Sequence, residues 1–358
     1  MGPQKSKLTD WPDNLKDVID WYLRTGEMDK GGNGISNKTK LKEAVKSVDG
    51  FTTATSDLGN FQVEGVAGLF NSVAGALQHL IGYNRNGNHD LTGEGIGRNQ
   101  SSPYTSSYTA KATWNGQLDT PGSTEANTVA SIFLGSMPMV YYFVTYLYWR
   151  CSNNKNGGWD TAELTNSHSG LNSFMINMDF PSEQLNGSMS GSQIVKLMTD
   201  FHYGFDGLNG VDKSGNSYEK FLGNLHKQHG ESKINSAMDC PVYTLYRAAK
   251  AYLKYKFEEP KADENEENIR DIKKMFQNFT AACKSAYELK DEFAKFLTDI
   301  NANITVSSET TNDNSSPSPA APVAGTLSTL GLGGGAAAAY VFNLGGTKTI
   351  VDRLLKIG

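Results

Sequence analysis

The feature that most constrains the fold is a run of twenty residues without a charged side chain at 130–149, which reads ASIFLGSMPMVYYFVTYLYW. A run of this length is long enough to cross a lipid bilayer, and it also suits a helix that is buried on all sides in a protein core. Its four tyrosines, two phenylalanines and one tryptophan are typical of a packed interior. We therefore predict a buried core helix with a kink near Pro138, and keep a membrane-spanning helix as the alternative.

A second uncharged segment lies at 324–346 and reads AGTLSTLGLGGGAAAAYVFNLGG. It is long enough to span a bilayer, and small residues recur in it at Gly331, Gly335 and Ala339, as they do in closely packed membrane helices. The residues that follow, 347–358, contain three basic side chains and one acidic side chain. By the positive-inside rule, this pattern predicts one transmembrane helix followed by a tail on the inside.

The two uncharged segments do not both fit this charge bias. Two crossings would place both ends of the chain on the same side of the membrane. Arg150 and Lys155 mark the carboxyl flank of the first segment as inside, which would move the basic tail at 347–358 to the outside. A single crossing at 324–346 satisfies the rule.

Residues 301–323 are rich in Ser, Thr, Asn and Pro and lack apolar periodicity, which is typical of a flexible stalk. The sequence therefore predicts four parts. They are a helical ectodomain at 1–300, a disordered stalk at 301–323, a transmembrane helix at 324–346 and a short cytoplasmic tail at 347–358.

Apolar residues at helical spacing predict that the ectodomain is mostly α, with long polar loops. A first helix follows Asp13 and ends at Gly26. The polar stretch at 82–127 is expected to be a long loop that drapes over the body through scattered aromatic side chains. Further helices are expected at 38–48, 61–81, 192–200 and 218–225, and after Pro241.

The most regular helical pattern lies at 264–300. Its apolar residues recur at alternating intervals of three and four, which predicts a helical seam of more than four heptads. The seam either packs on this chain's own helices or forms a coiled coil with a partner chain. Its phenylalanine content favours the first, because dimeric coiled coils prefer Leu, Ile and Val. The seam residues are Ile269, Ile272, Phe276, Phe279, Cys283, Ala286, Phe293, Leu297 and Ile300.

No segment predicts a catalytic residue, a cofactor or a metal ion. The sequence contains neither a GxSxG nucleophile motif nor a Walker phosphate-binding loop. The letters GxGxxA occur from Gly331 to Ala336, but a dinucleotide-binding domain needs far more chain than the residues that follow. A formal net charge of −5 argues against nucleic-acid binding. The three cysteines, Cys151, Cys240 and Cys283, allow one disulfide with a leftover thiol or three thiols.

Two local patterns share only some features of metal sites. His226 and His229 stand three apart, but no acidic residue or cysteine lies nearby at ligand spacing, so we expect surface histidines. The segment 206–219 has the composition of a calcium loop. Ser217, however, occupies the position that needs glycine, and Gly223 occupies the position of the bidentate glutamate, so we expect a plain turn.

Six stretches of the chain are distinctive as a set and reach from one end to the other. They are LTDWPDNLKDVIDWYLRTGEMD at 8–29, YLYWRC at 146–151, PSEQLNGSMSG at 181–191, SYEKFLGNLHKQHG at 217–230, CPVYTLYRAAKAYLKY at 240–255 and GTLSTLGLGGGAAAAYVFNLGGTKTIVDRLLKIG at 325–358. In this order they resemble the variant erythrocyte surface antigen family of Babesia parasites. The chain departs from that family in two ways, because its members are typically much longer and rich in cysteine.

The resemblance implies a protein on the surface of the infected red cell, held there by its carboxyl-terminal apolar segment. It also implies antigenic variation, adhesion to host endothelium through a host cell-surface receptor, and pairing with a sister antigen chain. The loops at 82–127, 152–158 and 205–217 would then form the variable display surface, because loops tolerate sequence change while a helical core keeps the fold. The alternative is a soluble intracellular helical scaffold without a membrane span.

Overall fold

The computed structural model describes residues 4–27, 35–48, 50–58, 63–83, 91, 94–97, 104–114, 118–153, 157–200, 204–213, 217–230, 240–258 and 266–304. All of them belong to the first of the two units into which the chain divides, Met1–Ser308. The second unit, Glu309–Gly358, lies outside the described residues, and so do the predicted transmembrane helix, the cytoplasmic tail and most of the predicted stalk.

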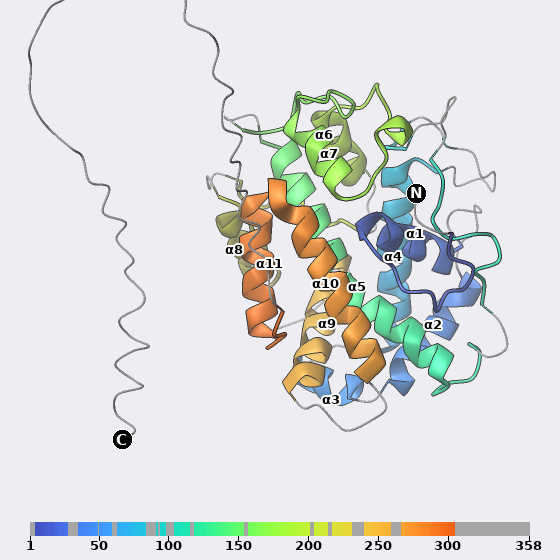
Figure 1. Ribbon diagram of the computed structural model, residues 1–358. Helices are drawn as coiled ribbons and strands as arrows, with labels where there is room; N and C mark the ends of the chain where they lie inside the picture. The colour runs from blue at the N-terminus through green and yellow to red at the C-terminus, as the bar shows by residue number, and fades with distance from the viewer. Residues whose placement is uncertain are drawn as a thin grey trace, which may run out of the picture. The chain divides into compact units, whose positions relative to one another are not determined.

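Helices make up most of the described residues, and no β-strand occurs among them (Figure 1), which confirms the prediction of a mostly α fold. The α-helices in chain order are α1 (Leu15–Thr25), α2 (Ile35–Ser47), α3 (Phe51–Thr55), α4 (Val63–Ile81), α5 (Thr124–Cys151), α6 (Gly170–Asn177), α7 (Gly191–Asp200), α8 (Tyr218–His229), α9 (Pro241–Glu258), α10 (Glu266–Ala282) and α11 (Tyr287–Asp299).

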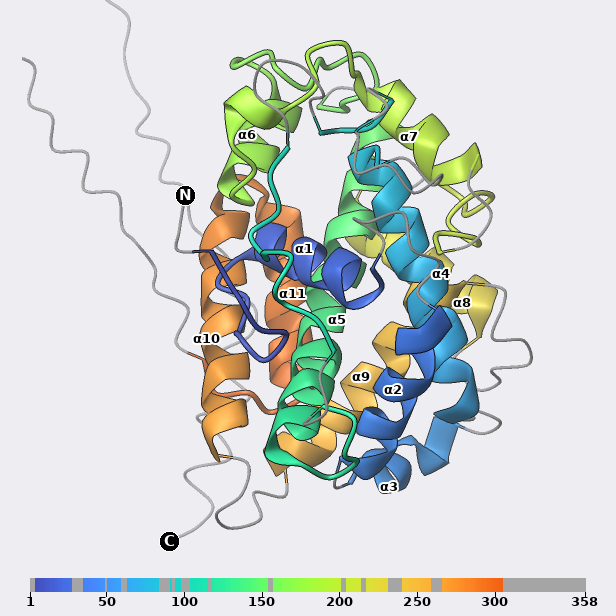
Figure 2. The same cartoon turned by 90° about the vertical axis from the view of Figure 1, so that its right-hand side faces the viewer.

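Helix α5 lies at the centre of the helical body (Figure 2) and contacts α1, α2, α7, α8, α9, α10 and α11. Every residue at 129–149 is buried, which confirms the prediction of a core helix. Within the described residues, α5 alone is long and apolar enough to cross a membrane, and 94% of the residues in its most apolar stretch are buried. The helix begins earlier than its apolar run indicates, because Ser123 caps it by accepting a hydrogen bond from the N–H of Ala126.

Most of the other predicted helices are also confirmed. Asn14 caps α1 by accepting a hydrogen bond from the N–H of Asp17 at 2.8 Å, and the helix ends before Gly26. The predictions at 38–48, 61–81, 192–200 and 218–225 and after Pro241 correspond to α2, α4, α7, α8 and α9. Helices α3 and α6 are not predicted, because each is too short to show an apolar period.

The predicted seam at 264–300 folds as two helices rather than one. Between α10 and α11 the chain forms a short 3₁₀ turn, Cys283–Ser285, and then leaves helical geometry at Ala286, with φ −127° and ψ 70°. The rings of Phe276 and Phe293 consequently lie 5.6 Å apart, whereas a straight helix would separate these residues by about 25 Å. Both helices contact α5. The described seam phenylalanines are buried, so the seam packs on this chain's own helices, as the favoured interpretation predicts.

The described parts of the polar stretch at 82–127 place several side chains in the core. Tyr104 and Tyr108 are buried, and each hydroxyl bonds to the amino-terminal part of the chain. The hydroxyl of Tyr104 donates to Oδ1 of Asp20 at 2.7 Å, and that of Tyr108 donates to the backbone oxygen of Asp10. The described residues at 104–109 thus lie against the body, as predicted, but these tyrosines are not free to vary as a display surface would.

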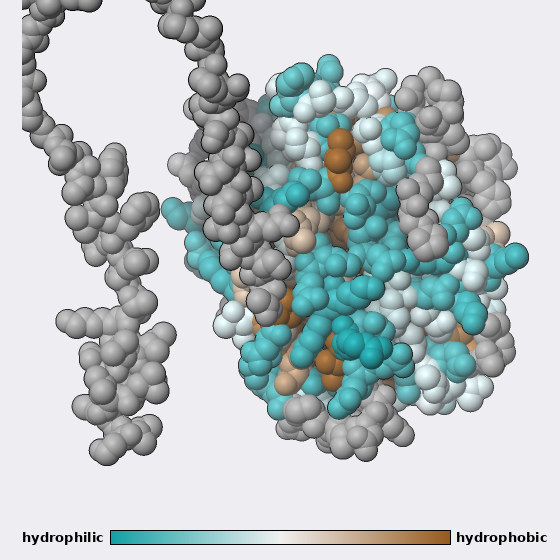
Figure 3. Space-filling model, viewed as in Figure 1, coloured by the Kyte–Doolittle hydropathy of each residue, from teal (hydrophilic) through white to brown (hydrophobic). Residues whose placement is uncertain are grey.

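The face of the body shown in Figure 3 is mainly polar. On this face, hydrophobic residues form small, separate patches among hydrophilic ones (Figure 3). Among the large hydrophobic side chains of the described residues, Ile176 is 43% exposed and Tyr287 is 73% exposed. Scattered apolar residues of this kind are ordinary on a protein surface.

Candidate functional site

A cleft opens between the amino-terminal segment, residues 105–107 and the stretch that follows α6. We call it the N-terminal cleft. Its volume is about 370 Å³, which lies within the range of pockets that hold small molecules or side chains. The lining combines apolar side chains from 176–181 with five charged ones, Lys5, Asp13, Lys16, Asp17 and Asp179.

Backbone hydrogen bonds hold the amino-terminal segment against the body. The N–H of Lys5 donates to the oxygen of Ser107, and the N–H of Thr109 donates to the oxygen of Lys5, both at 2.8 Å. The indole N–H of Trp21 on α1 donates to the oxygen of Leu8 at 2.9 Å. The side chain of Lys5 is therefore placed in the cleft by a fixed backbone.

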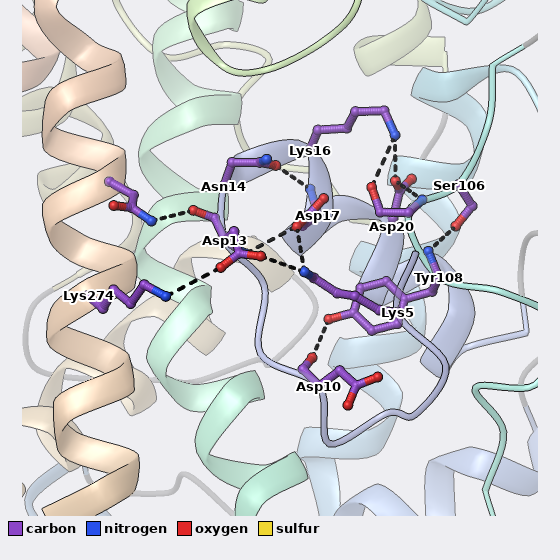
Figure 4. A network of polar contacts seen from close by, with 12 residues as sticks. Lys5, Asp10, Asp13, Asn14, Lys16, Asp17, Asp20, Ser106, Tyr108 and Lys274 are labelled. Carbon is purple, nitrogen blue, oxygen red and sulfur yellow. Dashed lines mark hydrogen bonds and ion pairs between the residues drawn. The ribbon is translucent and has the colours of Figure 1, made fainter. Parts of the chain in front are cut away.

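Lys5 joins two carboxylates at the start of α1 (Figure 4). Its Nζ lies 2.7 Å from Oδ2 of Asp13 and 3.1 Å from Oδ2 of Asp17. Burial lowers the pKa of Lys5, but the hydrogen bond with Asp13 and the charge of Asp17 outweigh burial and raise it above the ordinary value. Lys274 on α10 also approaches Asp13, with Nζ 3.7 Å from Oδ1. The charge of Lys5 is thus shared by two carboxylates.

Lys16 and Asp20 form a buried ion pair one turn apart on α1, with Nζ 2.7 Å from Oδ2. Lys16 also donates to the backbone oxygen of Thr105 at 2.8 Å. Asp20 accepts from the hydroxyl of Tyr104 at 2.7 Å and from the N–H of Ser107 at 2.8 Å. Burial, followed by the charge of Asp20, raises the pKa of Tyr104 well above its ordinary value, so its hydroxyl remains a donor. The charged groups of Lys16 and Asp20 are therefore both bonded within the fold.

Asp179 is the one charged lining residue of the cleft that makes no ion pair with the other described residues. It lies two residues after α6 with φ 65°, a left-handed conformation that Asp and Asn adopt more readily than most residues. Its N–H donates to the oxygen of Ile176 at 2.9 Å. Burial, and then the charge of Asp17, raise the pKa of Asp179. Asp179 is nevertheless an exposed residue, so water solvates its carboxylate, which makes no ion pair with the described residues.

A second group of polar side chains lies inside the body, between α5, α8 and α9. Tyr141 stacks on Tyr246 with ring centroids 4.1 Å apart, and its hydroxyl lies 2.8 Å from Nε2 of His226. The hydroxyl of Tyr218 and Oγ1 of Thr145 are 2.7 Å apart. We call this group the tyrosine cluster, and its members are Tyr141, Tyr142, Tyr218, Tyr243, Tyr246 and His226.

The prediction that His226 and His229 are simple surface residues is wrong for His226. Its ring packs beside both Tyr141 and Tyr243, at centroid distances of 6.3 and 5.0 Å. Burial, followed by the charges of Lys250 and Arg247, lowers the pKa of His226 to about 4. The ring is therefore neutral at pH 7 and is part of the packing of the cluster. Nε2 of His229 lies 3.0 Å from the backbone oxygen of Gly207.

The cysteines and the candidate metal ligands can be placed directly. Cys151, Cys240 and Cys283 are free and buried. Of the two states that the sequence allows, the structure therefore has three thiols rather than one disulfide and a leftover thiol. Burial raises the pKa of Cys151 and of Cys283, so both remain protonated thiols at neutral pH. Within the described ranges, no three His, Cys, Asp or Glu side chains gather as a metal site requires. The GxGxxA letters lie outside these ranges.

Sequence reasoning assigns no site residue, and it misses the N-terminal cleft. One signal was available, because Asp13, Asp17 and Asp20 recur at intervals of four and three and so lie on one side of a helix and of the residues that cap it. Lys5 and Asp179 carry no comparable signal, since only the tertiary fold brings them to that side.

Comparison with known proteins finds no matching protein-family model, no similar curated protein and no similar solved structure.

Proposed function

We propose that the chain is a membrane-anchored variant surface antigen of infected red cells, which works by contact with other proteins. In this proposal the helical body at 1–300 lies outside the cell, 324–346 is the single transmembrane helix and 347–358 is the cytoplasmic tail. The body binds a host cell-surface receptor on the endothelium, acts with a paired sister chain and undergoes antigenic variation.

The burial of α5 is the observation that carries this proposal. This helix has the length and apolarity of a membrane span, yet helices from both halves of the body pack around it. Moving α5 into a bilayer would separate these helices and leave their apolar faces in water. The role of anchor then falls to 324–346, which is uncharged and is followed by a basic tail.

The resemblance to the surface antigen family supports the same proposal. The stretch at 8–29 contains α1, the stretch at 146–151 ends α5, and the stretch at 240–255 contains most of α9. These helices contact one another or meet at α5, so three of the segments that carry the resemblance build the centre of the body.

The variable display surface is narrower than the three predicted loops. Within 82–127, the exposed described residues include 119–122, whereas Tyr104 and Tyr108 are buried. Within 205–217, Phe205 and Leu208 are buried. Substitutions between sister copies in one parasite genome should therefore concentrate at the exposed positions and spare the buried ones. Substitutions concentrated in the buried positions would contradict antigenic display by these loops.

Protease protection on intact infected cells tests the topology. One antibody recognises 118–125, which contains the exposed residues 119–122, and another recognises the last ten residues. We expect protease to remove the first epitope from intact cells and to leave the second. If both epitopes survive on intact cells and are lost together after lysis, the chain is internal and the surface role fails.

Carbonate extraction tests the anchor separately, and it also tests the alternative of a soluble intracellular scaffold. The wild-type chain should resist extraction. The double substitution Gly334→Arg and Ala338→Arg should release it, because arginine is strongly disfavoured at the centre of a membrane helix. Gly65→Arg and Gly68→Arg form the matched control, because the space beside both glycines on α4 is open. Release of the wild type, or equal release of both variants, would contradict the proposed anchor.

A further inference from the structure

We infer that the N-terminal cleft binds a basic side chain, arginine or lysine, from a protein partner. This inference rests on the proposed function only in that the partner is another protein. It does not depend on the membrane anchor, on the identity of the receptor or on antigenic variation.

The charge balance of the cleft is the first argument. Three carboxylates and two ammonium groups line it, so the lining is negative overall. Neither ammonium group is available to an incoming anion, because Lys5 bridges Asp13 and Asp17 and Lys16 is paired with Asp20. Asp179 remains without a counter-ion in the described part of the chain. The net negative charge of the lining therefore favours a cationic ligand, with Asp179 as the exposed carboxylate that it can reach.

The field of the surrounding carboxylates points the same way. After burial, the charges of Asp17, Asp10, Asp20 and Asp13 raise the pKa of Tyr108, whose hydroxyl bonds to the backbone oxygen of Asp10. The charge of Asp17 likewise acts on Asp179. A bound cation would reduce the repulsion among these carboxylates.

The shape and polarity of the lining provide the second argument. Ile176, Phe180 and Pro181 line the same side of the cleft as Asp179. Ile176 is 43% exposed, and it is one of only two large hydrophobic side chains with high exposure among the described residues. Lysine and arginine combine an apolar stem with a charged end, and such side chains bind best where an apolar wall leads to a carboxylate. An acidic or purely apolar side chain would leave Asp179 unpaired.

The rigidity of the site provides the third argument. Asp179 is held at φ 65° by a turn whose N–H bonds to Ile176, and Gln184 accepts a hydrogen bond from the N–H of Thr105 at 3.2 Å across the cleft. A preformed site loses little conformational entropy when it is occupied.

The test uses the full chain in detergent, with isotope-labelled isoleucine methyl groups observed by NMR. The tripeptide acetyl-Gly-Arg-Gly-amide is titrated, and acetyl-Gly-citrulline-Gly-amide serves as a neutral ligand of nearly the same shape. We expect the methyl signal of Ile176 to shift with the arginine peptide and not with the citrulline peptide. The signal of Ile272, which is buried on α10, should stay unchanged. Equal shifts with both peptides, or none with either, would overturn the inference.

Asp179→Asn removes the carboxylate that we propose pairs with the cation of the ligand. It keeps the left-handed turn, because asparagine also adopts this conformation. Its affinity for the arginine peptide should fall about fivefold, the effect of one partly screened charge pair. Asp291→Asn is the matched control, since Asp291 is exposed on α11 and does not line the cleft. Unchanged affinity in Asp179→Asn, or equal losses in both variants, would contradict the assignment.

A third titration with putrescine separates a protein side chain from a free diamine. Weaker binding of putrescine than of the arginine peptide supports a side-chain ligand, whereas stronger binding of putrescine overturns it. A chain that fails the protease-protection test can still bind the arginine peptide, and a surface-exposed chain can fail to bind it. The two proposals can therefore fail independently.

Discussion

The N-terminal cleft and the tyrosine cluster bury polar groups in two different ways. In the cleft, charged groups neutralise one another in ion pairs such as Lys16 with Asp20. In the cluster, neutral hydroxyls bond to one another, to a backbone oxygen and to a neutral histidine, as Tyr218 does with Thr145 and Tyr142. Burial raises the pKa of Tyr218 well above its ordinary value, so this region carries no charge at pH 7.

This difference indicates which of the two regions can bind a ligand. A network of neutral groups under α5 can be closed completely, because hydroxyls both donate and accept. Buried charges need opposite charges beside them, as Lys16 and Asp20 show, whereas an exposed charge is also solvated by water. In the cleft Asp179 is exposed and makes no ion pair with the described residues, so a cation can reach it. Four substitutions test this contrast, from the largest expected effect to the smallest.

Lys16→Met should cause the largest loss of stability. It leaves the fully buried carboxylate of Asp20 without its cation, which costs about 3 kcal/mol in the free energy of unfolding. The measurement is urea unfolding at pH 7. Lys295→Met is the matched control, because the ammonium group of Lys295 is exposed in its pairs with Glu219 and Glu292, and its loss should cost less than about 0.5 kcal/mol. Equal losses would show that the Lys16 pair is not a buried one.

Tyr218→Phe should destabilise the tyrosine cluster less, by about 1.5 kcal/mol, because it removes hydrogen bonds without leaving a charge. Thr145 would keep its own bond to the backbone oxygen of Tyr141 at 2.7 Å. Thermal unfolding measures the effect. Tyr287→Phe removes the same hydroxyl from a residue that is 73% exposed, and it should change nothing measurable. A loss above about 3 kcal/mol for Tyr218→Phe would mean that the hydroxyl network is not closed by neutral groups.

His226 should make the cluster sensitive to acid. Its folded-state pKa of about 4 lies below the value of about 6.5 in an unfolded chain, so the unfolded chain binds the proton more readily. Its contribution is complete above pH 6.5 and is lost as the pH falls towards 4. Because the ring is partly exposed, we expect about 1 kcal/mol.

The measurement is the free energy of unfolding at several pH values from 4 to 7. His226→Gln should flatten the dependence across this window. His168→Gln provides the comparison, since His168 is exposed and should leave the dependence unchanged. An unaltered slope in His226→Gln would assign the acid sensitivity to other groups.

Asp179→Asn should have the smallest effect on stability, and the opposite sign. The raised pKa of Asp179 shows that the fold disfavours its ionised form, so removing the charge should stabilise the chain by less than about 0.5 kcal/mol at pH 7. The gain should disappear as the pH falls through that pKa and the wild-type carboxyl becomes neutral. Chemical unfolding at pH 7 and pH 4 gives the comparison. A clear loss of stability at pH 7 would mean that Asp179 has a counter-ion within the fold.

Sequence reasoning found the helices whose signals are local. The capping residue and the glycine that delimit α1, and the uncharged run within α5, are readable without any tertiary information. The break at Ala286 is different, because apolar spacing continues through it and periodicity cannot distinguish one helix from two that fold back. The turn is revealed by the contact of Phe276 with Phe293, which only the folded chain makes.

The candidate site was less predictable than the fold. Its α1 carboxylates are visible as an acidic helix face, but Lys5 and Asp179 reach the cleft from positions more than 150 residues apart in the chain. The burial of Tyr104 and Tyr108 also has no local signal, because both lie in a stretch whose composition is typical of a loop.

The central position of α5 has a consequence for biosynthesis. The chain completes α1, α2 and α4 before α5, whereas α9, α10 and α11 follow only after Pro241. At synthesis rates of about 5–20 residues per second, the aromatic run of α5 waits on the order of ten seconds for these later partners. The early helices can shield one side of it in that interval, and the other side stays open to chaperones and to the membrane-insertion machinery. The order in which the helices are made therefore leaves the aromatic run of α5 only partly covered until α9, α10 and α11 have been synthesised.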